Sequence, residues 1–376
     1  MKKILSILLC AVMVASMTAG CKSKSAGSSS EVPSSSSAGK SSGEKAAGDN
    51  AKKMAVICSS GGLGDNGYND ASKRGLDQAA EELGLEYTIV EPAEVSQGET
   101  YLRQFAQEGY GLVVTLEYSH ADAVEMVADE FPDVTFVVFN LIVDKPNVIS
   151  IMFDIQDASY LAGIIAGELT KPEVTIIGDR QMKEGNTVGF ISATDSPGFK
   201  VFYEAFYQGA YSVNPDIQII TDFTVGFSDT QNSKAVAINQ IQSQNADVIF
   251  VAAGLAALGV FQGVKECNVL ALGATDDMDA KEPGFIVTSA VKRMDTALYK
   301  LADQLLNGEL EKGTVVMTLE EGGADLTDYS VIAPYITDEV KWDEIKREVE
   351  QARKDIIDGK IDVVDGSMGE VFTPGT

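Results

Sequence analysis

Short apolar runs alternate with amphipathic stretches along most of this chain. The apolar run at 54–58 precedes a stretch, 69–83, in which Leu76, Ala79 and Leu83 fall on one helical face. The same alternation predicts further strands at 87–90, 112–116, 135–139 and 148–153, and helices at 100–108, 121–130 and 158–169. Strands that alternate with helices form parallel sheets, because each parallel pair needs a crossover connection.

A second series of the same kind follows. It predicts strands at 188–191, 217–220, 247–252, 269–272 and 285–288, and helices at 199–211, 231–241, 258–264 and 296–306. The patterned part of the chain, about 320 residues long, is too large for one ordinary hydrophobic core. We therefore expect an α/β protein with two doubly wound, Rossmann-like lobes facing each other across a cleft. A last helix is predicted at 338–357, with Trp342 packed against a lobe.

The amino terminus has the layout of a secretory signal peptide. Lys2 and Lys3 precede an apolar run at 4–14, which is too short to span a bilayer, and small residues follow it. Cys21, directly after the small residues, resembles the acylated cysteine of bacterial lipoproteins. We expect removal of residues 1–20 and a lipid on Cys21 that anchors the protein to the extracytoplasmic face of the cell membrane. The alternative is an ordinary cleaved signal followed by an incidental cysteine.

The segment after Cys21 is predicted to be a flexible tether. Residues 21–53 are dominated by Ser, Gly, Ala and Lys and cannot bury enough apolar surface to fold. The stretch from Ala38 to Ser41 superficially resembles a phosphate-binding P-loop. The first glycine of that pattern falls on Ser34, however, and no strand precedes it, so we expect no nucleoside triphosphate site.

Charge and composition exclude several classes of function. The formal net charge of -27 repels phosphate backbones, so nucleic acid is not an expected partner. The single histidine, His120, excludes a His-rich zinc site. Asp276, Asp277 and Asp279 lack the spacing of a calcium-binding EF-hand loop. The sequence therefore predicts neither a metal nor a cofactor.

The loop after the first strand carries the clearest motif. Ligands of open α/β sheets bind beyond the carboxyl ends of the strands, and residues 59–69 place four glycines there, ahead of a helix. Their spacing is not that of a dinucleotide-binding loop. Gly61 and Gly62, followed by Asp65 and by Tyr68 with Asn69, are instead similar to the signature of the basic membrane lipoprotein family. These are the PnrA-like, purine-nucleoside-binding lipoproteins of ABC transporters.

The resemblance extends over nearly the whole mature domain. Matching segments lie at 131–134, 160–163, 188–191, 202–210, 214–216, 246–250, 253–254, 288–292 and 359–361. It implies a type I periplasmic-binding-protein fold, two lobes joined by three hinge crossings that close on a nucleoside. The boundaries we expect are 54–148 with 289–312 for the N-terminal lobe, 149–288 with 313–331 for the C-terminal lobe, and 332–376 for a C-terminal helical extension.

The chemistry of a purine suggests which residues bind it. A flat base with a polar rim needs aromatic faces and groups that hydrogen-bond to its edge. Tyr68 and Phe202 match the family's two stacking positions and come from opposite lobes, while Asn69 offers a donor and acceptors to the base. Periodicity alone favours another interpretation, in which Tyr68 packs at a helix start and Phe202 lies in the core.

Three positions depart from the family pattern. Ser59 stands where the family has an Asp that holds the ribose, and Asn140 replaces an Asp that contacts the purine edge. Thr275 replaces the first Asp of a G-V-D-x-D loop, for which Asp276 is an alternative carboxylate. The other implied contacts to the sugar are Gly254, Asp277 and Lys292.

The predicted function is a monomeric, extracytoplasmic solute-binding lipoprotein. It would deliver a nucleoside, with a purine base, to an ABC permease in the membrane. An enzyme is disfavoured, because the sequence has no nucleophile elbow, no zinc motif and no convincing acid/base pair. Two alternatives remain open: a surface sensor or adhesion lipoprotein with the same fold, and a binding protein for a non-nucleoside small molecule.

Overall fold

The computed structural model describes residues 50–65, 67–171, 174–178 and 185–375. The predicted signal peptide, the lipid site at Cys21 and most of the tether lie outside the described residues. The folded part begins before position 54. Asn50 and Lys53 close a turn through a backbone hydrogen bond of 2.9 Å, and the side chain of Asn50 donates to the carbonyl oxygen of Glu108 at 2.7 Å.

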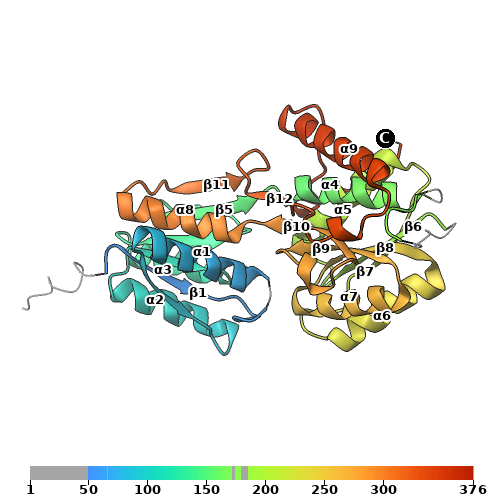
Figure 1. The fold of residues 1–376 in the computed structure, drawn as a ribbon. Coiled ribbons are helices and arrows are strands. Elements are labelled where there is room, and N and C mark those ends of the chain that lie inside the picture. The colour runs from blue at the N-terminus through green and yellow to red at the C-terminus, as the bar shows by residue number, and fades with distance from the viewer. Residues whose placement is uncertain (1–49, 66, 172–173, 179–184, 376) are drawn as a thin grey trace, which may run out of the picture. The chain divides into compact units, whose positions relative to one another are not determined.

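The first sheet has six strands in the order β11-β5-β4-β3-β1-β2, all paired in parallel (Figure 1). Its strands are β1 (Lys53–Ile57), β2 (Glu86–Val90), β3 (Leu112–Thr115), β4 (Thr135–Phe139), β5 (Val148–Phe153) and β11 (Gly313–Met317). Its helices are α1 (Tyr68–Leu83), α2 (Gly98–Gln107), α3 (Ala121–Glu130) and α8 (Met294–Asn307). Alternate residues of β1 face opposite ways: Met54 packs with α1 and α8, and Ala55 with α2 and α3.

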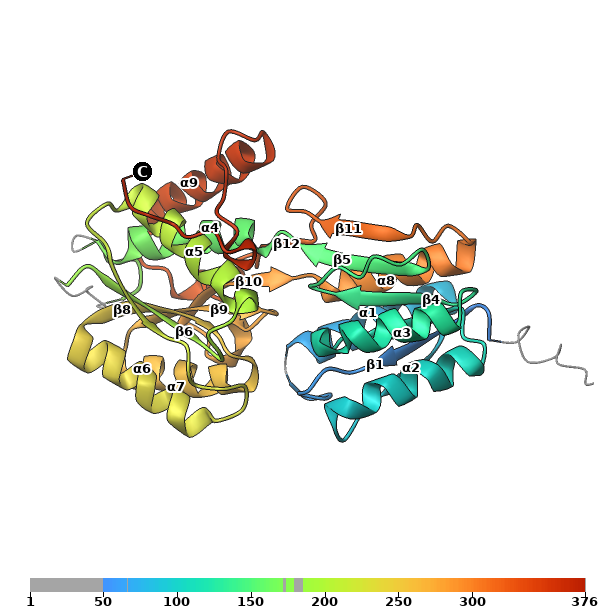
Figure 2. The same ribbon diagram turned by 180° about the vertical axis from the view of Figure 1, so that it is seen from behind.

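The second sheet has the order β12-β10-β9-β8-β6-β7, and only its edge strand β12 is antiparallel to its neighbour among the described pairs. Its strands are β6 (Thr187–Ser192), β7 (Gln218–Asp222), β8 (Ala246–Ala252), β9 (Leu270–Thr275), β10 (Ile286–Lys292) and β12 (Ala324–Leu326). Helices α4 (Ile155–Leu169), α5 (Pro197–Val213) and α9 (Glu339–Ile357) cover one face, and α6 (Thr230–Gln244) and α7 (Ala257–Cys267) cover the other (Figure 2).

Short 3-10 helices complete the described elements. They are η1 (Val95–Gln97), η2 (Tyr118–His120), η3 (Gly254–Ala256), η4 (Asp279–Lys281), η5 (Ala333–Tyr335) and η6 (Gly366–Met368). The predicted α/β architecture with two doubly wound sheets is confirmed. In the described part of the chain, no helix is both long enough and apolar enough to span a membrane.

The strand pairing moves the predicted lobe boundaries. Residues 149–153 and 313–317 pair within the first sheet, although the sequence analysis assigned them to the C-terminal lobe. Residues 289–292 belong to β10 of the second sheet, not to the N-terminal lobe. Hydrophobic periodicity identifies a strand but not its partner, which long-range pairing selects. The described chain passes between the sheets after β5, after β10 and after β11.

Two strands were not predicted, and both lie at a sheet edge. β11 is largely exposed, and its sequence has no clear alternation of apolar and polar residues. β12 has only three residues. The exposure of β11 and the length of β12 mean that neither has the buried apolar pattern on which sequence prediction depends.

The C-terminal extension is firmly packed. Trp342 of α9 is buried, and its ring meets the ring of Tyr329 edge-on at a centroid distance of 5.3 Å. Lys341 binds the buried carboxylate of Glu168 on α4 at 3.0 Å. The prediction that Trp342 packs against a lobe is therefore confirmed.

Glycines allow α4 and α5 to pack with their backbones in contact. A Cβ atom on Gly209 would collide with the carbonyl oxygen of Tyr160, and one on Gly163 with the carbonyl oxygen of Phe206. Gly167 would place a Cβ 2.6 Å from the carbonyl oxygen of Ala210. The position of α5 on the second sheet therefore depends on these small residues.

We expect Gly209→Ala to lower the free energy of unfolding by about 1–3 kcal/mol, because its methyl group meets rigid backbone. Gly198→Ala on the same helix is the matched control, since no described atom lies within 4 Å of a Cβ there. That change should leave stability the same or raise it by up to about 1 kcal/mol. Urea denaturation measures both, and equal effects would refute the close contact.

Candidate functional site

The glycine-rich loop after β1 is held by carboxylates. Four of its backbone N–H groups donate to them: Ser60 to Glu117 (2.9 Å), Leu63 to Glu91 (2.8 Å), Gly64 to Asp70 (2.8 Å) and Gly67 to Asp65 (2.9 Å). Burial acts to raise the pKa of Glu117, but hydrogen bonds from Ser60 and Ser119 outweigh it and hold that pKa below the usual value. Amides that could hold a phosphate are thus bound to negative charges of the protein itself.

Ser59 and Asn69, both predicted ligand contacts, bind each other. The Oδ1 atom of Asn69 accepts hydrogen bonds from the backbone N–H of Ser59 at 2.9 Å and from its hydroxyl at 3.2 Å. The Nδ2 atom of Asn69 donates to Asp65 at 2.9 Å, and the whole side chain is buried. In this conformation Asn69 fixes the loop to the start of α1.

Four other predicted residues meet in one chain of contacts. The hydroxyl of Tyr68 accepts a hydrogen bond from Nδ2 of Asn140 at 3.1 Å. Oδ1 of Asn140 accepts one from Nζ of Lys292 at 2.9 Å, and this ammonium lies 5.4 Å from the centre of the Phe202 ring. Tyr68 begins α1, Asn140 follows β4 and Lys292 ends β10, so the chain joins carboxyl ends of strands from both sheets.

Burial shifts the pKa values of Lys292 and Tyr68 in this hydrogen-bonded chain of side chains. It lowers the pKa of Lys292 to about 8, because the charged ammonium loses contact with water. Burial also raises the pKa of Tyr68, against the effect of the hydrogen bond from Asn140. At neutral pH, Lys292 is therefore charged and Tyr68 keeps its proton.

Phe202 and Phe227 differ in exposure. Phe202 is 1% exposed and packs edge-on against Phe250 at a centroid distance of 6.3 Å, so its ring offers no free face here. Phe227, in the loop after β7, is 51% exposed. Phe199 lies between them, with ring centroids 6.5 Å from Phe202 and 5.8 Å from Phe227.

Phe227 is a site candidate that the sequence analysis missed. Its carbonyl oxygen would lie 3.4 Å from a Cβ atom on Gly254, which was predicted to contact the ligand. Its position in a loop that follows a strand could have identified it from the sequence, because ligands of parallel sheets bind at such loops. No periodicity marked it, because exposed loop residues have none.

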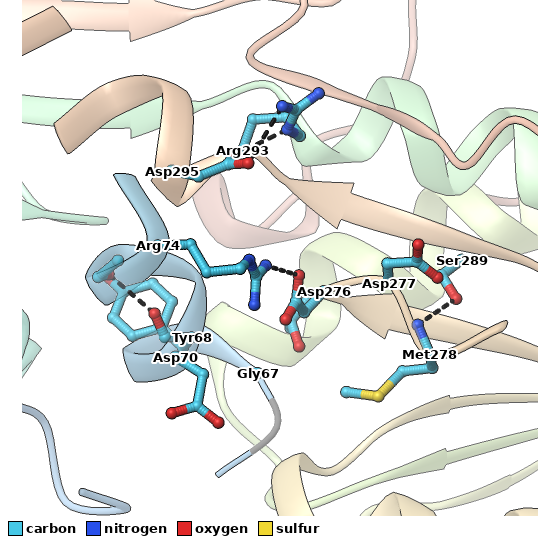
Figure 3. A network of polar contacts seen from close by, with 12 residues as sticks. Gly67, Tyr68, Asp70, Arg74, Asp276, Asp277, Met278, Ser289, Arg293 and Asp295 are labelled. Carbon is cyan, nitrogen blue, oxygen red and sulfur yellow. Dashed lines mark hydrogen bonds and ion pairs between the residues drawn. The ribbon is translucent and has the colours of Figure 1, made fainter. Parts of the chain in front are cut away.

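The loop after β9 holds three predicted positions. Thr275 has a positive φ of 74° and donates its hydroxyl to the carbonyl oxygen of Ala274 at 2.6 Å. Asp277 is exposed and accepts the N–H of Asp279 at 3.0 Å. Asp276, the alternative carboxylate, is buried and forms an ion pair with Arg74 of α1 at 2.6 Å (Figure 3). This ion pair, which the sequence did not predict, links the two sheets.

The described residues contain no group of three His, Cys, Asp or Glu side chains that could hold a metal ion. His120 is buried and structural: Nδ1 lies 2.7 Å from the hydroxyl of Thr115, and Nε2 lies 2.8 Å from the carbonyl oxygen of Val95. It fastens η1 to the end of β3. The arrangement can bind a small polar molecule, but it offers no donor set for a metal.

Comparisons with known proteins place the chain among ABC transporter substrate-binding proteins. A family model described as ABC transporter substrate-binding protein PnrA-like matches residues 52–363. The ABC transporter nucleoside-binding protein BmpA of Lactococcus lactis is 28% identical, and the match covers 96% of this chain and 99% of that protein. An uncharacterized lipoprotein of Pyrococcus abyssi is also 28% identical over 73% of this chain and 69% of its own length.

Solved structures give the same fold. The crystal structure of an ABC transporter solute-binding protein from Aeropyrum pernix K1 superposes with a TM-score of 0.72 and 25% identity. The superposition covers 83% of this chain and 93% of that one. The fold is therefore of the type I periplasmic-binding-protein class, as the sequence predicted.

Removing Arg74 should leave the buried carboxylate of Asp276 without its partner. We expect Arg74→Met to lower the free energy of unfolding at neutral pH by about 1–2 kcal/mol, less than for a fully buried pair because Arg74 is half exposed. Burial raises the pKa of Asp276, against the effect of Arg74, so the loss should shrink in acid as this carboxylate takes up a proton. Urea denaturation at neutral and at acidic pH measures the loss of stability under both conditions.

Lys73→Met is the matched control for this prediction. Lys73 is the neighbouring cation on α1, and its ion pair with Asp77 at 2.6 Å is exposed on both sides. Exposed pairs of this kind contribute roughly 0.3–0.5 kcal/mol. An equal loss in both variants would show that the Arg74 ion pair has no special role.

Proposed function

The chain belongs to the PnrA-like family of ABC transporter substrate-binding proteins, and on that basis we propose that it captures a nucleoside outside the cytoplasm for an ABC importer. It is a binding protein and not an enzyme. The family implies a small-molecule ligand and a permease partner. We propose a purine nucleoside, and a monomer anchored to the membrane through a lipid on Cys21.

The observation that carries the proposal is the hydrogen-bonded chain of Tyr68, Asn140 and Lys292. It places an aromatic ring, an amide and a cation together at the carboxyl ends of strands from both sheets. These groups match a flat base, its polar edge and the oxygens of a sugar. A base stacked on Tyr68 would gain about 1–3 kcal/mol.

We assign the second aromatic face to Phe227 and give Phe202 a supporting role. Phe227 exposes half of its side chain, whereas the buried Phe202 backs it through Phe199. The proposed contacts to the sugar and the polar rim of the base remain Ser59, Asn69, Gly254, Thr275, Asp277 and Lys292. Asn69 and Ser59 would act mainly by holding the loop that presents Tyr68, because they already bind each other.

Electrostatics favour an uncharged nucleoside over a nucleotide. Backbone N–H groups of the glycine-rich loop donate hydrogen bonds to carboxylates, and the protein carries a net charge of -27. A phosphate would meet these charges, and the four described N–H groups that could offset the repulsion already bind carboxylates. The relative from Lactococcus lactis is named a nucleoside-binding protein, which supports this ligand class. The relative from Pyrococcus abyssi is named a lipoprotein, which supports the lipid anchor.

Thermal shift against a panel of nucleosides and nucleoside monophosphates tests the ligand class. A nucleoside at about one hundred times its dissociation constant should add roughly 2.7 kcal/mol to the stability. The matching monophosphates should give little or no shift. Failure of every nucleoside, base and analogue to stabilise the protein would rule out the proposed function.

Variants of the two aromatic residues serve as the internal check of that experiment. Tyr68→Ala and Phe227→Ala should each reduce the shift, while Tyr335→Ala, which removes an exposed ring from η5, should not. A full shift in both site variants would place the ligand elsewhere.

The pKa of Lys292 predicts how affinity depends on pH. A ligand oxygen that accepts a hydrogen bond from the ammonium favours its charged form, so binding raises the pKa above its value of about 8 in the free protein. Affinity should be level near neutral pH and fall by up to about tenfold per pH unit as the pH rises through 8. Calorimetric titration across this range measures the effect. Lys292→Met should bind more weakly and with no such pH dependence, and a flat profile for the unaltered protein would contradict the contact.

A further inference from the structure

The C-terminal tail after α9 returns along α5, the helix that carries Phe202 (Figure 2). The backbone N–H of Phe372 donates to Glu204 at 2.9 Å, and the Phe372 ring meets the ring of Tyr207 edge-on at a centroid distance of 5.2 Å. Gly366 packs so closely on the first turn of α5 that a Cβ there would collide with the carbonyl oxygen of Lys200. The tail is therefore fixed to the helix that begins at the carboxyl edge of the second sheet.

Asp365 lies at a turn of this tail, and hydrogen bonds of the residues before and after it fix its position. One residue before it, the N–H of Val364 donates to Gln208 at 2.9 Å. Its own Oδ1 atom accepts hydrogen bonds from the N–H of Ser367 at 2.8 Å and from the Ser367 hydroxyl at 2.6 Å. In the described residues, no hydrogen bond reaches its Oδ2 atom. The carboxylate is thus oriented by its turn and keeps one oxygen for another partner.

Asp365 adjoins Gly366, which packs on the first turn of α5, and the ring centre of Phe202 on the same helix lies 5.4 Å from Nζ of Lys292. The Asp365 carboxylate therefore lies near the same end of α5 as Lys292. Burial lowers the pKa of Lys292, and the nearby Asp365 carboxylate acts in the opposite direction. Burial likewise raises the pKa of Asp154, just after β5, and Asp365 adds to that rise against a hydrogen bond from Gln156. Within the described contacts, Asp365 and Lys292 form no direct ion pair. Asp365 and Lys292 are thus opposite charges near the same end of α5 that do not bind each other directly in the described contacts.

Two other carboxylates at these strand ends are already bound. Asp276 pairs with Arg74, and Asp65 accepts hydrogen bonds from the backbone and side chain of Asn69. Unlike these two carboxylates, which are bound within the protein, the Asp365 carboxylate of the tail keeps one oxygen that no described hydrogen bond reaches. Residue 365 also lies beyond the family match, which ends at residue 363.

We propose that Asp365 contacts the ligand: its carboxylate accepts hydrogen bonds from the hydroxyl groups of a sugar that Lys292 binds from the other side. This inference rests on the proposed function, because it names the residue that recognises the sugar of the nucleoside. A carboxylate accepts two hydroxyl hydrogen bonds well, whereas an ammonium can only donate. Together the two residues make the site selective for a nucleoside with free ribose hydroxyls.

The test compares a ribonucleoside with its 2′,3′-dideoxy counterpart by calorimetric titration. Asp365→Asn keeps the shape of the side chain and an acceptor for Ser367. It should weaken ribonucleoside binding by about 10- to 100-fold, the effect of losing a hydrogen bond to a charged group. Binding of the dideoxy analogue should not change, because that ligand has no hydroxyl for Asp365. Asp362→Asn, an exposed carboxylate of the same tail, is the matched control and should change neither affinity by more than about twofold.

Each outcome decides the question. Equal affinities of Asp365→Asn and the unaltered protein for the ribonucleoside would overturn the inference and leave the proposed function standing. An equal loss for both ligands would also overturn it, because Asp365 would then only support the fold. If Asp365→Asn does not fold, Ser367→Ala, which frees the carboxylate to turn away, should show the same selective loss. An unaltered protein that binds neither nucleoside would overturn the proposed function together with this inference.

Discussion

The hydrogen bond from Lys292 to Asn140 is the interaction on which the candidate site depends. Lys292 ends β10 of the second sheet, and Asn140 follows β4 of the first, so one contact joins two strand ends that are far apart in sequence. Tyr68 and Phe202 both contact this pair, Tyr68 through the amide of Asn140 and Phe202 through its ring beneath the ammonium. Because parallel strands bring their carboxyl ends to one edge, the fold itself makes this meeting possible.

The glycine-rich loop after β1 resembles a phosphate-binding loop in composition, but its described N–H groups bind side chains of the protein itself. Its glycines let the backbone turn ahead of α1, but carboxylates from the loop itself, from α1 and from two neighbouring strand ends hold its N–H groups. Four carboxylates therefore surround these N–H groups. Such a surface suits a neutral molecule recognised by stacking and by single hydrogen bonds, and it opposes an anion.

The close packing of α4 on α5 has consequences at both ends of α5. Glycines allow the two backbones to touch, which fixes α5 on the second sheet and with it the buried Phe202. The C-terminal tail then packs along α5 and places Gly366, next to Asp365, on the first turn of that helix. A helix placed by small residues thus positions an aromatic support and a carboxylate that arrive from distant parts of the chain.

The sequence alone determined the fold class and the order of most elements, because buried strands and amphipathic helices have local periodicity. It also identified the family, because a sequence motif is recognised without knowledge of its contacts in the fold. It also selected Tyr68, Asn140, Lys292 and Phe202. Only the tertiary structure decided that Asn69 binds Ser59 and that Arg74 forms an ion pair with Asp276. It also decided that Phe202 is buried while Phe227 is exposed. Strand pairing decided which sheet holds residues 149–153 and 313–317. These outcomes follow from contacts between distant residues, where geometry and burial choose among partners that one-dimensional patterns leave equivalent.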